Sequence, residues 1–210
     1  GHDRIFDHMM LDGLEDAYEP GRSMGTFGED CAAKYGFTRA EQDAFATASV
    51  ERAKAATASG AFAAEITPVT VKSRAGETVV SVDEGPGKVK LDKIASLKPA
   101  FKKDGTITAA SSSSINDGAA ALVMMRASTA TKLGCKPLAR IVGHATHAQE
   151  PEWFATAPLG ATQKALAKAG WAVGDVDLWE INEAFAVVPM ALMKELNLPH
   201  DKVNVNGGAC

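Results

Sequence analysis

The fold is decided by the stretch Val176-Asp177-Leu178-Trp179-Glu180-Ile181-Asn182-Glu183-Ala184-Phe185-Ala186. Its first six residues form an apolar run that is typical of a buried strand, and a helical pattern follows from Ala184 to Leu196. The polar pair Asn182-Glu183 therefore falls where a strand ends and a helix begins. Open α/β folds bind ligands at this edge of the sheet. We therefore expect a functional site around this pair.

The residues alone leave two roles open for Asn182 and Glu183. An Asn amide at the end of a strand can donate a hydrogen bond to a developing oxyanion, directly or through a water that it holds. Both residue types also favour helix N-termini, so the pair could simply cap the helix that follows. The spacing of the residues favours neither role over the other.

Strand and helix patterns alternate through the C-terminal half of the chain, which predicts a layered α/β core with a substantially parallel sheet. The predicted strands cover residues 119–125, 138–148, 177–181 and 202–206, and the predicted helices cover 128–133, 158–169 and 184–196. Before them, a short strand is expected at 106–110, and the serine run 111–114 reads either as a flexible linker or as a tight loop.

The first hundred residues predict helices and a hairpin, which suggests a separate lid or insertion. A helix is expected from Met24 to Tyr35, with Gly36 as its left-handed end. Thr38 and Glu41 form a capping box for a second helix that reaches about residue 59. Two β-rich runs around a glycine-containing turn, within residues 68–82, predict a β-hairpin.

Composition excludes several classes of protein. A net charge of −4 argues weakly against a nucleic-acid partner, and no apolar run is long enough to cross a bilayer. The odd count of three cysteines predicts a reducing compartment and a cytoplasmic protein.

Cys31 and Cys210 have no adjacent basic residue to activate them as nucleophiles. His144 and His147 lack a third ligand at suitable spacing, so we expect no metal.

A set of motifs in a fixed order resembles the thiolase family, which comprises acetyl-CoA acetyltransferases and 3-ketoacyl-CoA thiolases. The resemblance covers essentially the whole chain. The motifs are Asn182-Glu183-Ala184-Phe185-Ala186, Met24-Gly25, Glu41-Gln42-Asp43-Ala44-Phe45-Ala46, Lys98-Pro99-Ala100-Phe101, Gly105-Thr106-Ile107-Thr108-Ala109, Ile115-Asn116-Asp117-Gly118-Ala119-Ala120 and Val203-Asn204-Val205-Asn206-Gly207-Gly208-Ala209.

The resemblance implies a thiolase-like layered α/β fold, present in part, with an inserted loop domain of helices and a hairpin. Residues 1–114 would form the loop domain that covers coenzyme A. Residues 115–134 would be the last strand and helix of the N-terminal thiolase half. Residues 135–210 would be the first part of the C-terminal half, truncated at Cys210.

The resemblance also implies the reaction and the residues that serve it. Acyl groups would move between acyl-CoA and coenzyme A, by thiolytic cleavage of a 3-ketoacyl-CoA or by Claisen condensation of two acetyl-CoA, with no further cofactor. Asn182 would hold the water that stabilises the enolate oxygen, and Ser113 would bind the pantetheine arm. The channel for that arm would be lined by Met24, Phe101, Ala184 and Phe185.

The departures from the family pattern matter as much as the matches. The family's nucleophilic cysteine, its Gly-His-Pro histidine and its second cysteine all fall outside this sequence. We therefore expect an internal segment of a longer chain, inactive alone, whose complete form is a homodimer or homotetramer. The alternative is a non-catalytic module that binds coenzyme A or serves assembly. A ketoacyl synthase is disfavoured because such enzymes carry a histidine where this chain has the Asn-Glu-Ala-Phe motif.

Overall fold

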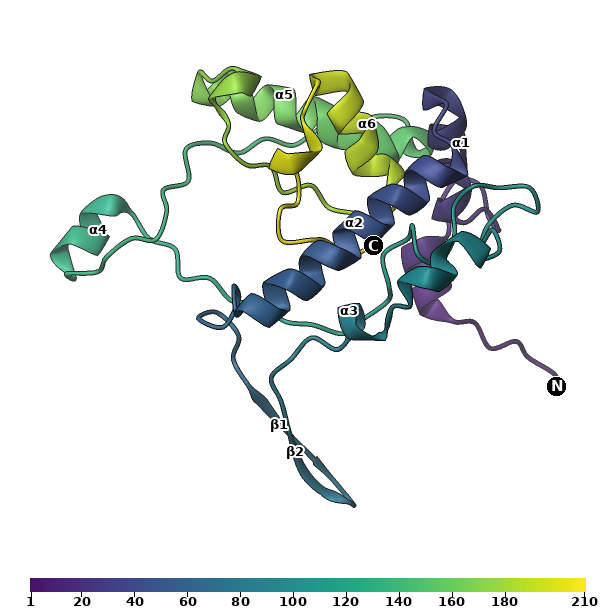
Figure 1. Cartoon of the computed structure of the whole chain (residues 1–210), viewed down its shortest axis with the longest axis horizontal. Helices are drawn as coiled ribbons and strands as arrows, with labels where there is room; N and C mark the ends of the chain where they lie inside the picture. The colour runs from purple at the N-terminus through teal and green to yellow at the C-terminus, as the bar shows by residue number, and fades with distance from the viewer.

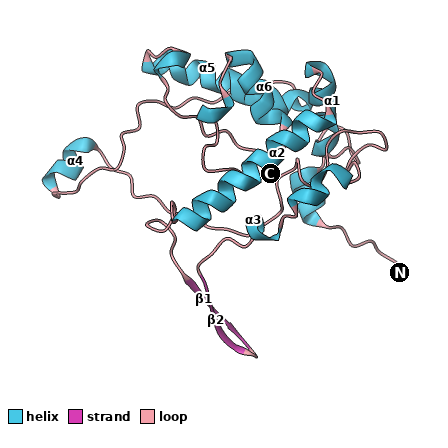
Figure 2. Ribbon diagram, viewed as in Figure 1, coloured by secondary structure: helices cyan, strands magenta, loops and turns pink.

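The computed structural model describes all 210 residues and is dominated by helices, with one small sheet (Figures 1 and 2). Short 3-10 or π-helical turns, labelled η, punctuate the loops. The elements are η1 (Met9–Leu14), α1 (Met24–Tyr35), α2 (Arg39–Ser59), β1 (Val69–Ser73), β2 (Gly76–Val80), α3 (Gly85–Lys88), η2 (Leu91–Ser96), α4 (Ala127–Lys132), η3 (Pro151–Thr156), α5 (Ala157–Ala169), η4 (Val173–Asp175), α6 (Val187–Leu196) and η5 (His200–Lys202).

The boundaries of α1 and α2 follow local rules that were readable in the sequence. Gly36 ends α1 in the left-handed conformation, with φ of 68°. The predicted capping box is confirmed: the Glu41 amide donates to Thr38 Oγ1, and the Thr38 amide donates to Glu41 Oε2 at 2.7 Å. Gly60 ends α2 with φ of 73°. Two long helices thus begin and end where expected.

The predicted hairpin is also confirmed. Strands β1 and β2 pair antiparallel, in a register that runs from Val69 opposite Val80 to Ser73 opposite Gly76. Every residue of both strands is exposed. The hairpin projects away from the helices as an isolated arm (Figure 1).

The core lies where α1, α6 and η3 meet. One cluster of buried apolar side chains joins α1 to the start of α6, and Ile107 and Phe185 lie inside it. A second, smaller cluster packs Ile181 and Val203 against Leu192 of α6. The functional motif at residues 182–186 runs between these two clusters, so both its ends are anchored by hydrophobic burial.

The predicted parallel sheet does not form within these residues. Residues 106–110, 119–125 and 138–148 contain no strand, and the pairing at 177–181 and 202–206 is a single parallel bridge between Trp179 and Val203. A strand requires a hydrogen-bonded neighbour, whereas an apolar run only signals a tendency to be buried. No strand partner lies beside residues 119–125 and 138–148, and both runs are largely exposed: Leu122 and Val123 are 85% and 90% accessible. Residues 106–110 differ, because Ile107 and Thr108 are buried there without forming a strand.

Candidate functional site

The strand that precedes the motif lies beside residues 202–204, which follow α6 (Val187–Leu196). The Trp179 amide donates to the Lys202 carbonyl at 2.9 Å, and the Asn204 amide donates to the Trp179 carbonyl at 2.8 Å. Helix α6 begins at Val187 behind Ala186, with no side-chain cap. The capping role considered for Asn182 and Glu183 is therefore wrong. The two side chains instead go opposite ways: Asn182 is exposed and Glu183 is fully buried.

Asn204 fixes the backbone on one side of Asn182. Its φ is +47°, a conformation that Asn tolerates better than most residues. The Ile181 amide donates to Asn204 Oδ1 at 2.8 Å, and Asn204 Nδ2 donates to the Ile181 carbonyl at 2.8 Å. The same Nδ2 donates to Glu183 Oε1 at 2.7 Å. One amide side chain thus holds both neighbours of Asn182.

Helix α2 holds the site from the other side. Ser49 Oγ donates to Glu183 Oε2 at 2.7 Å, and Ser49 Oγ accepts from the Gly208 amide at 2.9 Å. The Cys210 amide donates to Glu183 Oε2 at 2.9 Å. Arg52 of the same helix donates to the Val203 carbonyl at 2.7 Å. The turn 206–208 and the strand-end motif are therefore both fastened to α2.

The predicted pantetheine-binding residues come together. Met24, Phe101, Ala184 and Phe185 belong to one apolar cluster. The rings of Phe101 and Phe185 meet edge to face, with centroids 5.7 Å apart. A Cβ at Gly25 would overlap the Phe101 ring, so the glycine next to Met24 allows this close approach. The roles of these four residues stay predictions, although their proximity is a finding.

The serine run is a tight loop rather than a linker. The Ser113 amide donates to the Ala184 carbonyl at 3.1 Å, and the Ala186 amide donates to the Ser111 carbonyl at 2.9 Å. Ser112 and Phe185 form an antiparallel bridge. Ser113 therefore lies beside the strand-end motif, and its side chain is exposed there. Its binding role stays a prediction.

Glu29, Ser49 and Asn204 were not identified from the sequence as site residues. Glu29 of α1 is buried and accepts from the Thr106 and Ile107 amides, each at 2.9 Å, which fixes the loop leading to Ser113. The structure shows that Glu29 and Ser49 lie among the buried residues of their helices, and the sequence patterns placed neither on a buried face. A buried polar side chain requires a partner, but the sequence does not say which one.

The thiols are not prepared as nucleophiles. Burial raises the pKa of Cys31 to about 11. Burial, followed by the neighbouring Glu183 carboxylate, also raises the pKa of Cys210. Since the thiolate is the reactive form, both groups are held in the inert state. Cys135 is exposed.

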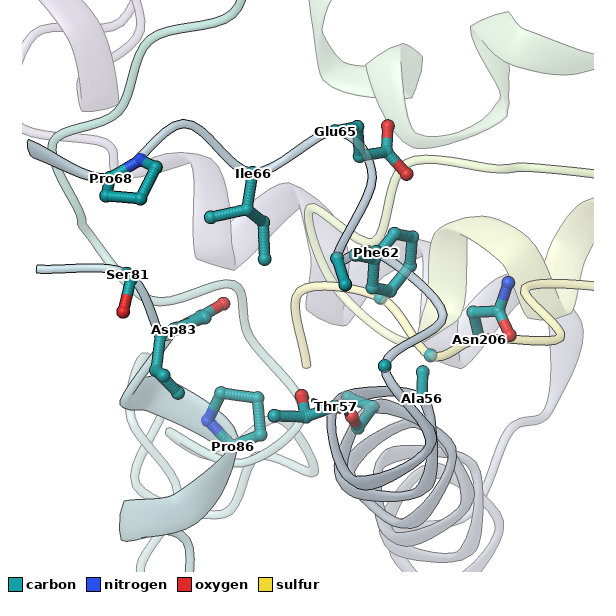
Figure 3. A pocket seen from close by; sticks show the side chains of 16 residues that line it. Ala56, Thr57, Phe62, Glu65, Ile66, Pro68, Ser81, Asp83, Pro86 and Asn206 are labelled. Atoms are coloured by element: carbon teal, nitrogen blue, oxygen red, sulfur yellow. Dashed lines mark hydrogen bonds between the residues drawn. The ribbon is translucent and has the colours of Figure 1, made fainter.

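One cavity adjoins the site, and none of the predicted binding residues lines it. It measures about 620 Å³ and lies between the end of α2, the loop at 60–68 and the foot of the hairpin (Figure 3). The turn 206–208 forms part of its wall. Its charged lining residues are Glu65 and Asp83, with no lysine or arginine. A lining of this charge does not suit the phosphates of coenzyme A.

No group of three or more His, Cys, Asp or Glu side chains could hold a metal ion. None of the helices combines the length and apolar character needed to cross a bilayer.

Comparison with known proteins gives a consistent result along the whole chain. Residues 1–128 match the thiolase N-terminal domain, and residues 135–210 match the thiolase C-terminal domain. A probable acetyl-CoA acetyltransferase from Dictyostelium discoideum is 50% identical over 210 residues, and an acetyl-CoA acetyltransferase from Paracoccus denitrificans is 48% identical. These matches cover 100% of this chain but 50% and 54% of the two relatives, so the chain spans about half the length of the curated relatives it matches.

A solved structure confirms the fold class. The Bacillus anthracis acetyl-CoA acetyltransferase superposes with a TM-score of 0.94 at 43% identity, covering 100% of this chain and 53% of that one. The thiolase-like α/β fold expected from the motifs is therefore confirmed. The division into segments at residues 114 and 134 stays a prediction.

Proposed function

Because the chain belongs to the thiolase family, we propose that the protein of which it is part transfers acyl groups between coenzyme A thioesters. The reaction would be the thiolytic cleavage of a 3-ketoacyl-CoA or its reverse, the condensation of two acetyl-CoA. The substrates would be acyl-CoA and coenzyme A, with no resident cofactor. We also propose a cytoplasmic homodimer or homotetramer in fatty acid metabolism.

The observation that carries this proposal is the geometry of Asn182. Its side chain is exposed at the end of a bridged strand, while its neighbours Ile181 and Glu183 are both held by Asn204. An amide on a fixed backbone can present a donor, or a bound water, to an oxygen that becomes negative in the transition state. Such preorganised donors stabilise developing charge because they need no reorientation during the reaction.

The surrounding residues support a role for the bound thioester. We propose that Met24, Phe101, Ala184 and Phe185 line the pantetheine channel and that Ser113 hydrogen-bonds the arm. The apolar cluster suits the methylene groups of the arm, and the exposed hydroxyl of Ser113 beside Ala184 suits its amides. The acyl-enzyme thiol would come from outside these 210 residues, because the family resemblance assigns that role to none of Cys31, Cys135 and Cys210. The raised pKa values of Cys31 and Cys210 support this assignment.

The test is Asn182→Ala in the full-length protein, with thiolysis of acetoacetyl-CoA followed by absorbance. The kcat should fall roughly 10²- to 10³-fold with little change in KM, as for removal of one oxyanion donor. Asn197→Gly is the control, because Asn197 is an exposed residue with φ of 53° at the end of α6. A kcat within threefold of wild type in the Asn182 variant would remove Asn182 from the mechanism.

The 210-residue polypeptide itself separates the proposal from its alternative. Under the proposal it gives no turnover with acetoacetyl-CoA and coenzyme A, whereas the full-length protein does. Binding of coenzyme A by calorimetric titration, with a full-length protein that has no thiolysis activity, would instead favour a non-catalytic binding or assembly module. Thiolysis by the isolated polypeptide would show that the proposed division of catalytic groups is wrong.

A further inference from the structure

The Glu183 carboxylate is buried without an ion pair. It is 1% accessible, and no lysine, arginine or histidine lies within salt-bridge distance of it. Removing a carboxylate from water is costly unless hydrogen bonds replace the lost hydration. Three protein donors replace the lost hydration of the Glu183 carboxylate: Ser49 Oγ, Asn204 Nδ2 and the Cys210 amide.

The direction of these bonds is fixed. Ser49 Oγ accepts from the Gly208 amide, so its own proton is free to point at Glu183 Oε2. The carboxylate is therefore an acceptor at both oxygens, and the network links α2, the strand-end motif and the turn 206–210. A well-packed apolar group would serve stability as well as or better than a buried charge. The network must therefore be explained by what it orients.

Asn182 lies between two residues that Asn204 holds. The residue before Asn182 is held at both its amide and its carbonyl by Asn204, and the residue after it is held by its carboxylate. We infer that Ser49 and Glu183 are positioning residues for Asn182, through which α2 sets the direction of the Asn182 amide. Both side chains are buried, so neither is open to a substrate. The inference rests on the proposed acyl-transfer function.

The experiment uses the full-length protein with Glu183→Gln and Ser49→Ala. Glutamine keeps the shape but puts an NH2 group against donors, so the strand end shifts. We expect kcat for acetoacetyl-CoA thiolysis to fall roughly 10- to 100-fold, with KM within threefold, because small misplacements of a catalytic group cost rate more than binding. Ser49→Thr, which retains the hydroxyl, should recover most of the rate lost in Ser49→Ala. The fold-loss of kcat in the Ser49→Ala, Glu183→Gln double variant should be smaller than the product of the fold-losses in the two single variants.

Val50→Ala is the matched control, since Val50 is the neighbouring buried residue of α2 and has no part in the network. It should lower the melting temperature while leaving kcat within twofold. Hydrogen exchange at the Gly208 and Cys210 amides gives a readout independent of activity, and should quicken at least tenfold in Glu183→Gln. If the Glu183→Gln variant does not fold, the kcat of Ser49→Ala tests the positioning role.

The possible outcomes distinguish failure of the proposed acyl-transfer function from failure of the positioning role of Ser49 and Glu183. An inactive wild-type protein overturns the proposed function and, with it, any catalytic role for the network. An active wild type whose Glu183→Gln and Ser49→Ala variants keep kcat within threefold overturns the positioning role alone. An equal loss of kcat in Val50→Ala also overturns it, because general loosening of α2 would then explain the effect.

Discussion

Replacing Gly207 by alanine tests how tightly the terminal turn packs against α2. Gly207 has φ of +82°, which is strained for any residue with a Cβ. The added Cβ would lie 2.5 Å from the Ser49 carbonyl oxygen and 2.6 Å from the Ala53 nitrogen. Both are backbone atoms inside a 21-residue helix, so neither can rotate away.

The magnitude follows from these two terms. The left-handed conformation costs alanine roughly 1–2 kcal/mol. An ordinary contact begins at 3.4 Å, so the turn would have to retreat by roughly 0.9 Å. Forcing an extra methyl group into a packed site adds about 1–3 kcal/mol. Gly207→Ala should therefore destabilise the protein by roughly 2–5 kcal/mol.

The assay is thermal unfolding of the full-length protein beside a matched variant, Gly36→Ala. Gly36 has φ of +68° and nothing within 4 Å of its added Cβ, so it carries the backbone strain without the clash. Gly207→Ala should melt about 1–4 °C lower than Gly36→Ala, since about 1–3 kcal/mol separates them and a protein of about twice this length shifts by roughly 1.2 °C per kcal/mol. Equal melting temperatures would refute the close packing of the turn on α2 and weaken the argument that α2 supports the site.

Two further predictions concern titrating groups. Iodoacetamide at pH 8, followed by peptide mass mapping, should label exposed Cys135 and spare Cys31, whose raised pKa of about 11 lowers its thiolate fraction about 100-fold relative to a pKa of 9. Partly buried Cys210, whose pKa is also raised, should be spared too, and rapid labelling of either thiol would contradict the raised pKa. Burial, with Arg52 nearby, lowers the pKa of His200, so its contribution to stability is present above its unfolded pKa of 6.5 and is lost as pH falls through the lower folded value. His200→Phe keeps the ring stacked on Phe45 and should lose less stability than wild type between pH 7 and 5, and an unchanged pH profile by thermal melting would count against this assignment.

Local structure was predictable where neighbouring residues determine it. The capping box at Thr38 and Glu41, the glycine ends of both helices and the hairpin within residues 68–82 are short-range features, and all were confirmed. The strands at 119–125 and 138–148 were predicted wrongly for the converse reason. Pairing depends on a partner that is distant in sequence, and hydrophobicity does not reveal whether one is present.

The sequence predicted residues of the candidate site, but not the residues that hydrogen-bond to Glu183 and hold the site in place. Asn182, Ser113 and Phe101 were all chosen from motifs, and the structure brings their segments together through the antiparallel contact of the serine loop with residues 184–186. The carboxylate of Glu183 was interpreted as a helix cap or a site group. Its actual partners lie on α2 and on the terminal turn, which no local pattern connects with it.

Motifs and short-range hydrogen bonds were enough to predict the family, the ends of α1 and α2 and the polar pair at the strand end. Only the tertiary structure decided that Asn182 faces outward while Glu183 turns inward to Ser49. That choice is made by contacts separated by 134 positions along the chain. The physical reason is that a buried carboxylate must find donors, and the packing of α2 against the turn 206–210 decides where those donors are.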